Sequence, residues 1–360
     1  MNLKTLGWNK YFEDKFKEIS TEGLVPARVI REYRNRYVIT AGDGDYDAEV
    51  TGKMQFNAGH RGELPAVGDW VAARTIPAEG KAIIVEIIPR LSAFSRKAAG
   101  KRTDEQVVAA NVDTVFIVTG LDGEFNARRV ERYLTIAWES GANPVLLLNK
   151  SDACDNIDEK IEEAGDAAIG LDIHPLSAHT GDGIDVLHRY LKEGNTVAFL
   201  GSSGVGKSSI INRLLGEERM AVGDQRRDGK GRHTTTHREL IVTPDSGVII
   251  DTPGMREIQL WGDDSQGVSR AFEDINVLSK ACKFRDCTHT SEPGCAVIAA
   301  LEDGSLDEKR YENYTKLLKE QEFIERRKDQ NAQLKEKARM KKFTRQIKSM
   351  KNMEPWRFRK

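Results

Sequence analysis

The sequence has few cysteines and no long apolar segment. Its 360 residues include only 4 cysteines, too few for a disulfide scaffold of this size. No apolar run approaches the roughly 20 residues that cross a bilayer. Residues 1–20 are mixed polar and charged, without the apolar core of a signal peptide. We therefore expect a cytoplasmic protein with no membrane partner.

The net charge of −1 conceals an uneven distribution of charge. Residues 335–360 carry 11 Lys and Arg against 2 acidic residues, so the rest of the chain is acidic. Trp356 and Phe358 interleave with the basic residues, which suits phosphate contact and base stacking. A solvated basic tail has the same composition, so both interpretations stay open.

The chain length predicts two or three domains, and 39% hydrophobic with 31% charged residues is typical of a globular protein. We place the boundaries at 1–94, 95–262 and 263–360, and we expect a monomer. The spacing of apolar residues in 1–20 predicts a short amphipathic helix. The last unit includes residues 306–350, whose composition predicts a long charged helix.

Short alternating runs between residues 23 and 91 predict a small barrel. They cover residues 26–30, 36–40, 48–51, 70–74 and 82–87, with turn-rich pieces between them. Five short strands favour a Greek-key barrel of the oligonucleotide-binding type. The basic residues of this region leave RNA binding possible, and a barrel used only for packing is the alternative.

Strands and helices alternate after a polar, basic segment at 95–102, which we interpret as a linker. Strands are expected at 112–119, 144–148, near Ile173 and at 197–200, with helices at 126–139, 158–165, 184–191 and 208–215. This order predicts a doubly wound α/β domain with ligands at the carboxyl ends of its strands.

A glycine-rich turn between the last of these strands and its helix predicts a phosphate-binding loop. The segment comprises Gly201, Ser202, Ser203, Gly204, Val205, Gly206, Lys207, Ser208 and Ser209. The glycines allow successive N–H groups to face one concavity, and the helix adds its positive N-terminal end. Lys207 is expected to act on the β- and γ-phosphates, and Ser208 to bind Mg²⁺.

A second motif, Asn149-Lys150-Ser151-Asp152, follows the strand at 144–148. The Asp152 carboxylate can accept two hydrogen bonds from guanine N1–H and its 2-amino group, donors that adenine lacks. Asn149 and Lys150 would brace the base pocket. Ser177-Ala178 ends a later apolar stretch, where a backbone N–H could contact guanine O6.

Two further segments follow the phosphate loop. Among Thr234, Thr235 and Thr236, we choose Thr235 as the hydroxyl that completes the Mg²⁺ shell when the γ-phosphate is present. The strand leading to Asp251-Thr-Pro-Gly254 ends in the pattern DxxG, in which Asp251 would hold Mg²⁺ through water and the Gly254 N–H would contact the γ-phosphate.

The order of these motifs is a circular permutation of the usual GTPase order, because the guanine motif precedes the phosphate loop. Met255 stands where Ras-type proteins have a glutamine that orients water. A methionine cannot do this, so slow intrinsic hydrolysis is expected. His233, beside the threonines, is the candidate group for positioning the water, and a loop histidine without a chemical role is the alternative.

Three cysteines and a histidine follow the DxxG segment: Cys282, Cys287, His289 and Cys295. Four soft ligands at this spacing predict one structural Zn²⁺ in a closed tetrahedral site. A disulfide pair is the alternative, which a cytoplasmic location disfavours. Cys154 stands apart and is interpreted as an ordinary thiol.

In combination these motifs resemble the circularly permuted, ribosome small-subunit-dependent GTPase A proteins of bacteria, over about residues 23–300. The resemblance implies a barrel, a permuted GTPase domain with GTP and GDP as ligands, and a C-terminal zinc domain. It also implies late maturation of the small ribosomal subunit, rRNA binding, and GTP hydrolysis that promotes release. The resemblance also suggests the role given to His233.

Other classes stay open at this point. A P-loop ATPase or kinase would lack the guanine selectivity of Asp152. A GTPase of tRNA modification or of metal transport would carry different additional domains. An RNA-binding protein without enzymatic activity would not turn over GTP.

Overall fold

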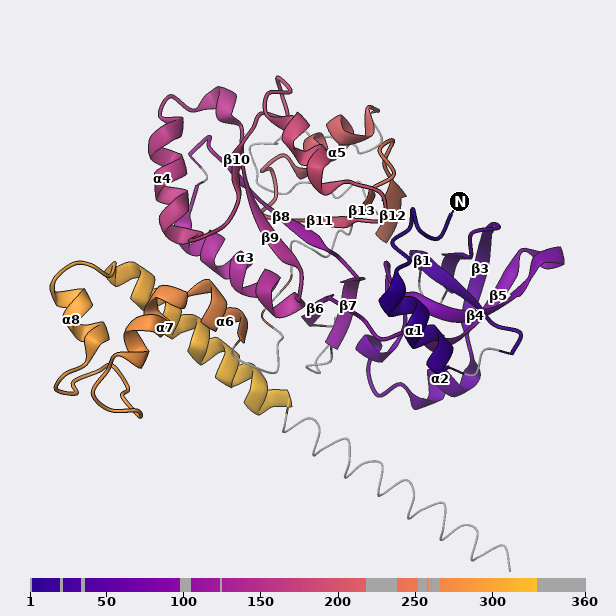
Figure 1. The fold of residues 1–360 in the computed structure, drawn as a ribbon, viewed down its shortest axis with the longest axis horizontal. Helices are drawn as coiled ribbons and strands as arrows, with labels where there is room; N and C mark the ends of the chain where they lie inside the picture. The colour runs from indigo at the N-terminus through magenta and orange to yellow at the C-terminus, as the bar shows by residue number, and fades with distance from the viewer. Residues whose placement is uncertain are drawn as a thin grey trace, which may run out of the picture.

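The structure is a computed structural model, and it describes residues 2–19, 22–33, 36–97, 105–123, 125–217, 238–251, 258, 260 and 266–328. Figure 1 shows a barrel, an α/β layer and a group of C-terminal helices. Within the described ranges, one 11-stranded sheet has the order β10-β9-β8-β11-β13-β12-β1-β2-β3-β5-β4. This sheet therefore runs through both the barrel and the α/β layer.

The N-terminal barrel closes because β4 pairs with both β5 and β1. Its strands are β1 (Val25–Tyr33), β2 (Arg36–Thr40), β3 (Asp45–Val50), β4 (Trp70–Ile76) and β5 (Lys81–Ile87). Alternate residues such as Val29, Ile39 and Ile84 fill the interior. Between β3 and β4 lie α2 (Gly52–Asn57) and the 3₁₀ turn η1 (Arg61–Glu63), and η2 (Pro77–Glu79) connects β4 to β5. The predicted five-stranded barrel is confirmed.

The N-terminal helix is shorter than predicted. Only α1 (Lys10–Glu18) is helical, and Asn9 caps it by accepting a hydrogen bond from the N–H of Phe12 at 3.3 Å. Gly7 has a φ of 91°, which ends the preceding turn and starts the helix late. Phe12 and Trp8 pack on Trp70, so α1 covers the barrel.

Within the described residues, the α/β layer contains five parallel strands and one antiparallel strand that borders the barrel. They are β8 (Thr114–Gly120), β9 (Asn143–Asn149), β10 (Ile173–Pro175), β11 (Thr196–Leu200), β13 (Val248–Asp251) and the antiparallel β12 (Arg238–Val242). On one face lie α3 (Ala127–Ser140) and α4 (Ile157–Ala167). On the other lie α5 (Lys207–Leu215) and η4 (Ile184–Tyr190), and η3 (Ser151–Ala153) follows β9. Successive residues of β8 alternate between the two cores, so the doubly wound layer is confirmed.

The segment predicted as a linker is partly a hairpin, so that prediction is wrong for its first residues. β6 (Ala93–Lys97) pairs with β7 (Glu105–Ala110) in a separate two-stranded sheet. Phe94 is 1% exposed, and this buried side chain fixes the strand despite its basic neighbours. The remaining residues, 98–102, lie outside the described ranges.

Two neighbouring ion pairs join the barrel to the α/β layer, where β1 pairs with β12. Arg31 lies opposite Glu239, and Glu32 lies opposite Arg238. Arg31 donates to Glu239 at 2.6 Å and Arg238 to Glu32 at 2.5 Å. No local sequence pattern indicates this junction, because the paired residues lie 208 and 206 positions apart.

The described part of the C-terminal region, residues 266–328, contains mainly helices. It comprises α6 (Gln266–Ala271), α7 (Glu273–Lys280), α8 (Ala296–Glu302) and a helix over residues 308–328, drawn in yellow in Figure 1. Its apolar residues, such as Val268, Phe272 and Leu317, belong to the same core as the inner face of α3. In the part of the chain that the structure describes, no helix combines the length and apolarity that a membrane crossing needs.

Candidate functional site

The predicted phosphate loop lies between β11 and α5, and its glycines adopt conformations that other residues rarely take. Gly201, Gly204 and Gly206 have φ values of 152°, 82° and 97°. A Cβ on Gly206 would stand 2.1 Å from the amide nitrogen of Asn149, and one on Gly201 would stand 2.3 Å from the Val118 carbonyl. Glycine is therefore required for the loop to pack against its neighbours.

The positive groups of this loop converge. α5 begins at Lys207, and its N-cap is Gly206, which has no side chain to occupy the N–H groups of the first turn. The Lys207 ammonium lies inside the loop, donating to the carbonyls of Gly201 at 2.7 Å and Ser202 at 2.5 Å. Ser208 and Ser209 fall in the first turn of α5, and Ser203 and Gly204 are exposed. The arrangement suits an anionic phosphate group.

Asn149 connects the predicted base motif to the phosphate loop. This residue is 2% exposed and ends β9. Its amide nitrogen donates to the Val205 carbonyl at 2.7 Å, and its side-chain oxygen accepts from the Ala178 N–H at 2.9 Å. One side chain thus holds together three segments that the sequence separates.

Asp152 lies at the same edge of the sheet as Asn149. The Ser177 hydroxyl donates to Asp152 Oδ1 at 2.5 Å. This hydrogen bond, the largest cause, lowers the pKa of Asp152, so the carboxylate is ionised and its other oxygen can accept hydrogen bonds. Lys150 adopts the left-handed conformation, with a φ of 65°. Ser151 begins the η3 turn.

Two further residues that support this pocket escaped the sequence analysis. Asp122 forms an ion pair with Lys150 at 2.5 Å, which fixes the lysine side chain within the base motif. Arg213, in the last turn of α5, donates to the carbonyls of Ala178 at 3.1 Å and His179 at 2.6 Å. A polar residue just after β8 is a signal that could have indicated Asp122, whereas no pattern in the sequence indicates Arg213.

The predicted Mg²⁺ ligands are only partly described. β13 runs parallel to β11 with Ile250 opposite Ala198, so Asp251 ends its strand close to the start of the phosphate loop. The Asp251 carboxylate and the Ser208 hydroxyl offer the oxygen ligands that Mg²⁺ prefers, and both residues therefore fit the ion. Thr235, His233 and Gly254 lie outside the described residues, and their roles stay predictions.

The three cysteines and the histidine of the C-terminal region converge. Their ligand atoms all lie within 4.8 Å of one another. Cys282 Sγ is 3.8 Å from Cys295 Sγ and 3.6 Å from His289 Nδ1, which is 3.3 Å from Cys295 Sγ. Zinc bonds of about 2.3 Å to sulfur and 2.0–2.1 Å to nitrogen imply tetrahedral edges of about 3.8 Å and 3.5 Å. The cluster fits a closed tetrahedral metal site.

The surroundings of this cluster also favour a cation. None of its cysteines forms a disulfide. Ser279 bonds the other ring nitrogen of His289 at 3.1 Å, which orients the imidazole as metal-bound histidines require.

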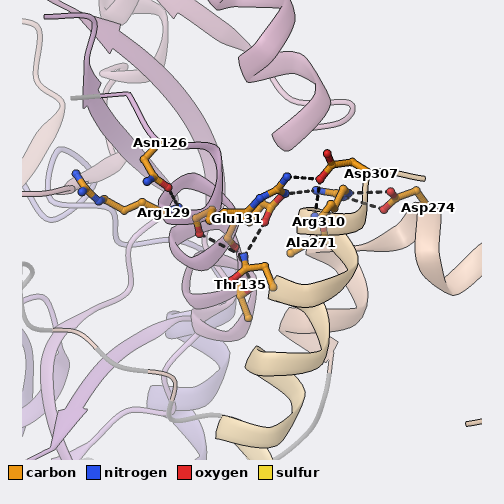
Figure 2. Close-up of polar contacts among 10 residues, drawn as sticks. Asn126, Arg129, Glu131, Thr135, Ala271, Asp274, Asp307 and Arg310 are labelled. Carbon is orange, nitrogen blue, oxygen red and sulfur yellow. Dashed lines mark hydrogen bonds and ion pairs between the residues drawn. The ribbon is translucent and has the colours of Figure 1, made fainter. Parts of the chain in front are cut away.

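A polar network fastens the C-terminal helices to α3, as Figure 2 shows. Glu131 on α3 is 0% exposed and accepts from Arg310 at 3.0 Å and Asn313 at 2.6 Å. Arg310 also holds Asp274 at 2.7 Å. Arg128 pairs with Glu131 and with Asp307 of the C-terminal region.

The strand order, together with a base motif that precedes the phosphate loop in the sequence, defines a circularly permuted P-loop GTPase fold. The model of the RsgA GTPase family matches residues 87–261, and that of the 50S ribosome-binding GTPase family matches residues 196–334. The small ribosomal subunit biogenesis GTPase RsgA of Opitutus terrae is 46% identical over 95% of this chain and 96% of its own. The small ribosomal subunit biogenesis GTPase RsgA 1 of Oceanobacillus iheyensis is 44% identical over 94% of this chain and 98% of its own.

Solved structures agree with these matches. The crystal structure of YjeQ from Thermotoga maritima has a TM-score of 0.62 at 28% identity, covering 83% of this chain and 98% of its own. YloQ, titled a circularly permuted GTPase, has a TM-score of 0.60 at 24% identity, covering 84% and 96%, and supports the fold alone. The chain belongs to the RsgA family of small ribosomal subunit biogenesis GTPases, and it is a GTP-hydrolysing enzyme.

Proposed function

We propose that this GTPase is an assembly factor in late maturation of the small ribosomal subunit, and that it acts in the cytoplasm as a monomer. It binds ribosomal RNA of that subunit, the subunit stimulates hydrolysis, and hydrolysis promotes release. The observation that carries the proposal is one GTPase site flanked by a barrel of the oligonucleotide-binding type and a Cys₃His cluster. The proposed domains are 1–94, 95–262 and 263–360.

The placement of the described nucleotide-site residues supports the roles proposed for them. Asp152 recognises guanine, and Asn149 and Lys150 frame the base. Ser177 and Ala178 support this pocket, since the Ser177 hydroxyl donates to Asp152 and the Ala178 N–H donates to Asn149. The loop from Gly201 to Ser209 holds the phosphates, with Lys207 neutralising their charge. Ser208 and Thr235 would bind Mg²⁺ and Asp251 would hold it through water, and the ion would neutralise charge on the phosphate oxygens.

The proposed stimulation depends on the water-positioning group. Because Met255 cannot orient water, docking on the subunit brings another group into place, and His233 is the candidate for that group. Ordering a catalytic group can raise the rate by about 10³–10⁵-fold, as arginine fingers do. GTP favours the docked state and GDP the released state.

The decisive experiment measures GTP turnover with purified small subunits, large subunits or neither. We expect strong stimulation by small subunits alone, and loss of that stimulation in His233→Ala with GTP binding retained. His237→Ala, in the same segment, is the matched control and should keep the stimulation. Full stimulation of His233→Ala would assign the catalytic group elsewhere, and equal stimulation by large subunits would contradict the proposed partner.

A further inference from the structure

Two side chains of α3 contact the phosphate loop from outside the known GTPase motifs. Arg129 donates from Nη1 to the hydroxyl of Ser202 at 3.2 Å, and the Tyr133 hydroxyl lies 3.3 Å from the same oxygen. Residues four apart lie on the same face of a helix, so both reach Ser202 together. Ser202 is the second residue of the loop, next to the carbonyls that hold Lys207.

The backbone under Arg129 is firmly placed. Asn126 caps α3 by accepting from the Arg129 N–H at 2.9 Å, a contact drawn in Figure 2. The same figure shows the Arg129 side chain extending away from the network of Glu131 and Arg310. Because that network and the sheet clamp α3 from two sides, the helix presents Arg129 to the loop at a fixed position.

We propose that Arg129 is a positioning residue for the phosphate loop and strengthens the binding of guanine nucleotides. The proposal rests on the phosphate-binding role proposed above for residues 201–209. Arg129 acts in two ways: its hydrogen bond restrains Ser202, and its guanidinium keeps a permanent positive charge beside a loop that binds an anion. Since GTP carries more negative charge than GDP, the charge favours GTP over GDP.

α3 itself offers a matched control. Arg132 lies on the same helix, is half-buried like Arg129, and forms a bidentate ion pair with Glu320 at 2.7 and 2.6 Å. It contacts the C-terminal helix rather than the loop. Arg132→Met therefore removes an arginine of equal size and charge from α3 and leaves the contacts to Ser202 in place.

The experiment measures affinity and dissociation rate of fluorescent methylanthraniloyl-GTP and -GDP on the full chain with Mg²⁺. Arg129→Met should weaken GTP binding by about 3- to 10-fold, the effect of one hydrogen bond, mostly through faster dissociation. Arg129→Lys should recover part of the affinity, because it keeps the charge. Arg132→Met should bind as the unchanged protein does.

A double substitution separates positioning from a general effect. If Arg129 acts through Ser202, both substitutions remove the same contact. The loss of GTP affinity in the double variant Arg129→Met/Ser202→Ala should then be smaller than the product of the two single losses. Fully multiplicative losses, or an equal loss in Arg132→Met, would overturn the proposal. Lys207→Ala tests the loop separately: if it binds GTP normally, the assigned phosphate site is wrong, whatever Arg129 does.

Discussion

Arg310 is the residue whose removal should most disturb the attachment of the C-terminal region. The residue is 6% exposed, and its guanidinium donates hydrogen bonds to Glu131, Asp274 and the Ala271 carbonyl. The guanidinium also lies 4.8 Å from the centre of the Phe272 ring. The substitution Arg310→Met keeps the apolar stem and deletes the charge. The buried Glu131, which is 0% exposed, then loses one of the positive charges that stabilise its carboxylate.

The expected loss follows from the burial and from the contacts that remain. Breaking a buried ion pair on one side generally costs about 3–5 kcal/mol. Glu131 keeps Arg128 and Asn313, and Asp274 is partly exposed, so we expect about 2–4 kcal/mol. Replacing both partners, Arg310→Met/Glu131→Gln, should cost less than Arg310→Met alone, because no unpaired charge stays buried.

The pH dependence gives an independent check. Burial, the largest cause, raises the pKa of Glu131 above its usual value. A raised folded pKa means that ionisation of Glu131 opposes folding as the pH rises, and the loss of Arg310 increases this opposition. The difference between Arg310→Met and the unchanged protein should therefore shrink as the pH falls toward the pKa of Glu131.

Urea unfolding at several pH values measures these differences. Circular dichroism and metal release to a chromogenic chelator are the two signals that report unfolding. Arg326→Met is the control, because its ion pair with Glu322 is exposed, at 74% and 63%, and should contribute under about 0.5 kcal/mol. A loss in Arg310→Met below about 1 kcal/mol, or a loss that is the same at every pH, would refute the reasoning.

Two further predictions concern the base pocket and the metal cluster. Asp152→Asn should weaken GTP binding and favour xanthosine triphosphate, whose 2-oxo group needs a donor; nucleotide competition measures this, and unchanged GTP affinity would exclude the assignment. One Zn²⁺ should be bound per chain by elemental analysis, and Cys287→Ala should lose it and unfold the C-terminal region while nucleotide binding stays nearly intact. A metal-free protein with a stable C-terminal region would contradict the zinc prediction.

Features that depend on local pattern could be predicted from the sequence. The strands of the barrel and of the α/β layer alternate or run apolar, and the motifs follow strands whose carboxyl ends share one edge. The cysteine spacing likewise predicted the cluster, since its four ligands lie within one short stretch. In each case the determining residues are neighbours in the sequence.

Features that depend on contacts between distant segments could not be predicted. The hairpin of β6 and β7 is stabilised by burial of Phe94, which its basic neighbours conceal. Arg213 acts on carbonyls of residues 178 and 179, and a backbone carbonyl leaves no signature in a sequence. The same holds for the ion pair of Glu131 with Arg310, which joins residues 179 positions apart.

α3 lies between the phosphate loop and the C-terminal helices. Arg129 and Tyr133 contact the phosphate loop directly at Ser202. After β13, the chain reaches α6, where a Cβ on Gly267 would stand 2.6 Å from the Thr135 carbonyl, so that α6 lies directly against α3. The phosphate loop and the C-terminal helix α6 thus both contact α3, whereas the barrel is joined at β12, on the opposite side of β13 from the phosphate-loop strand.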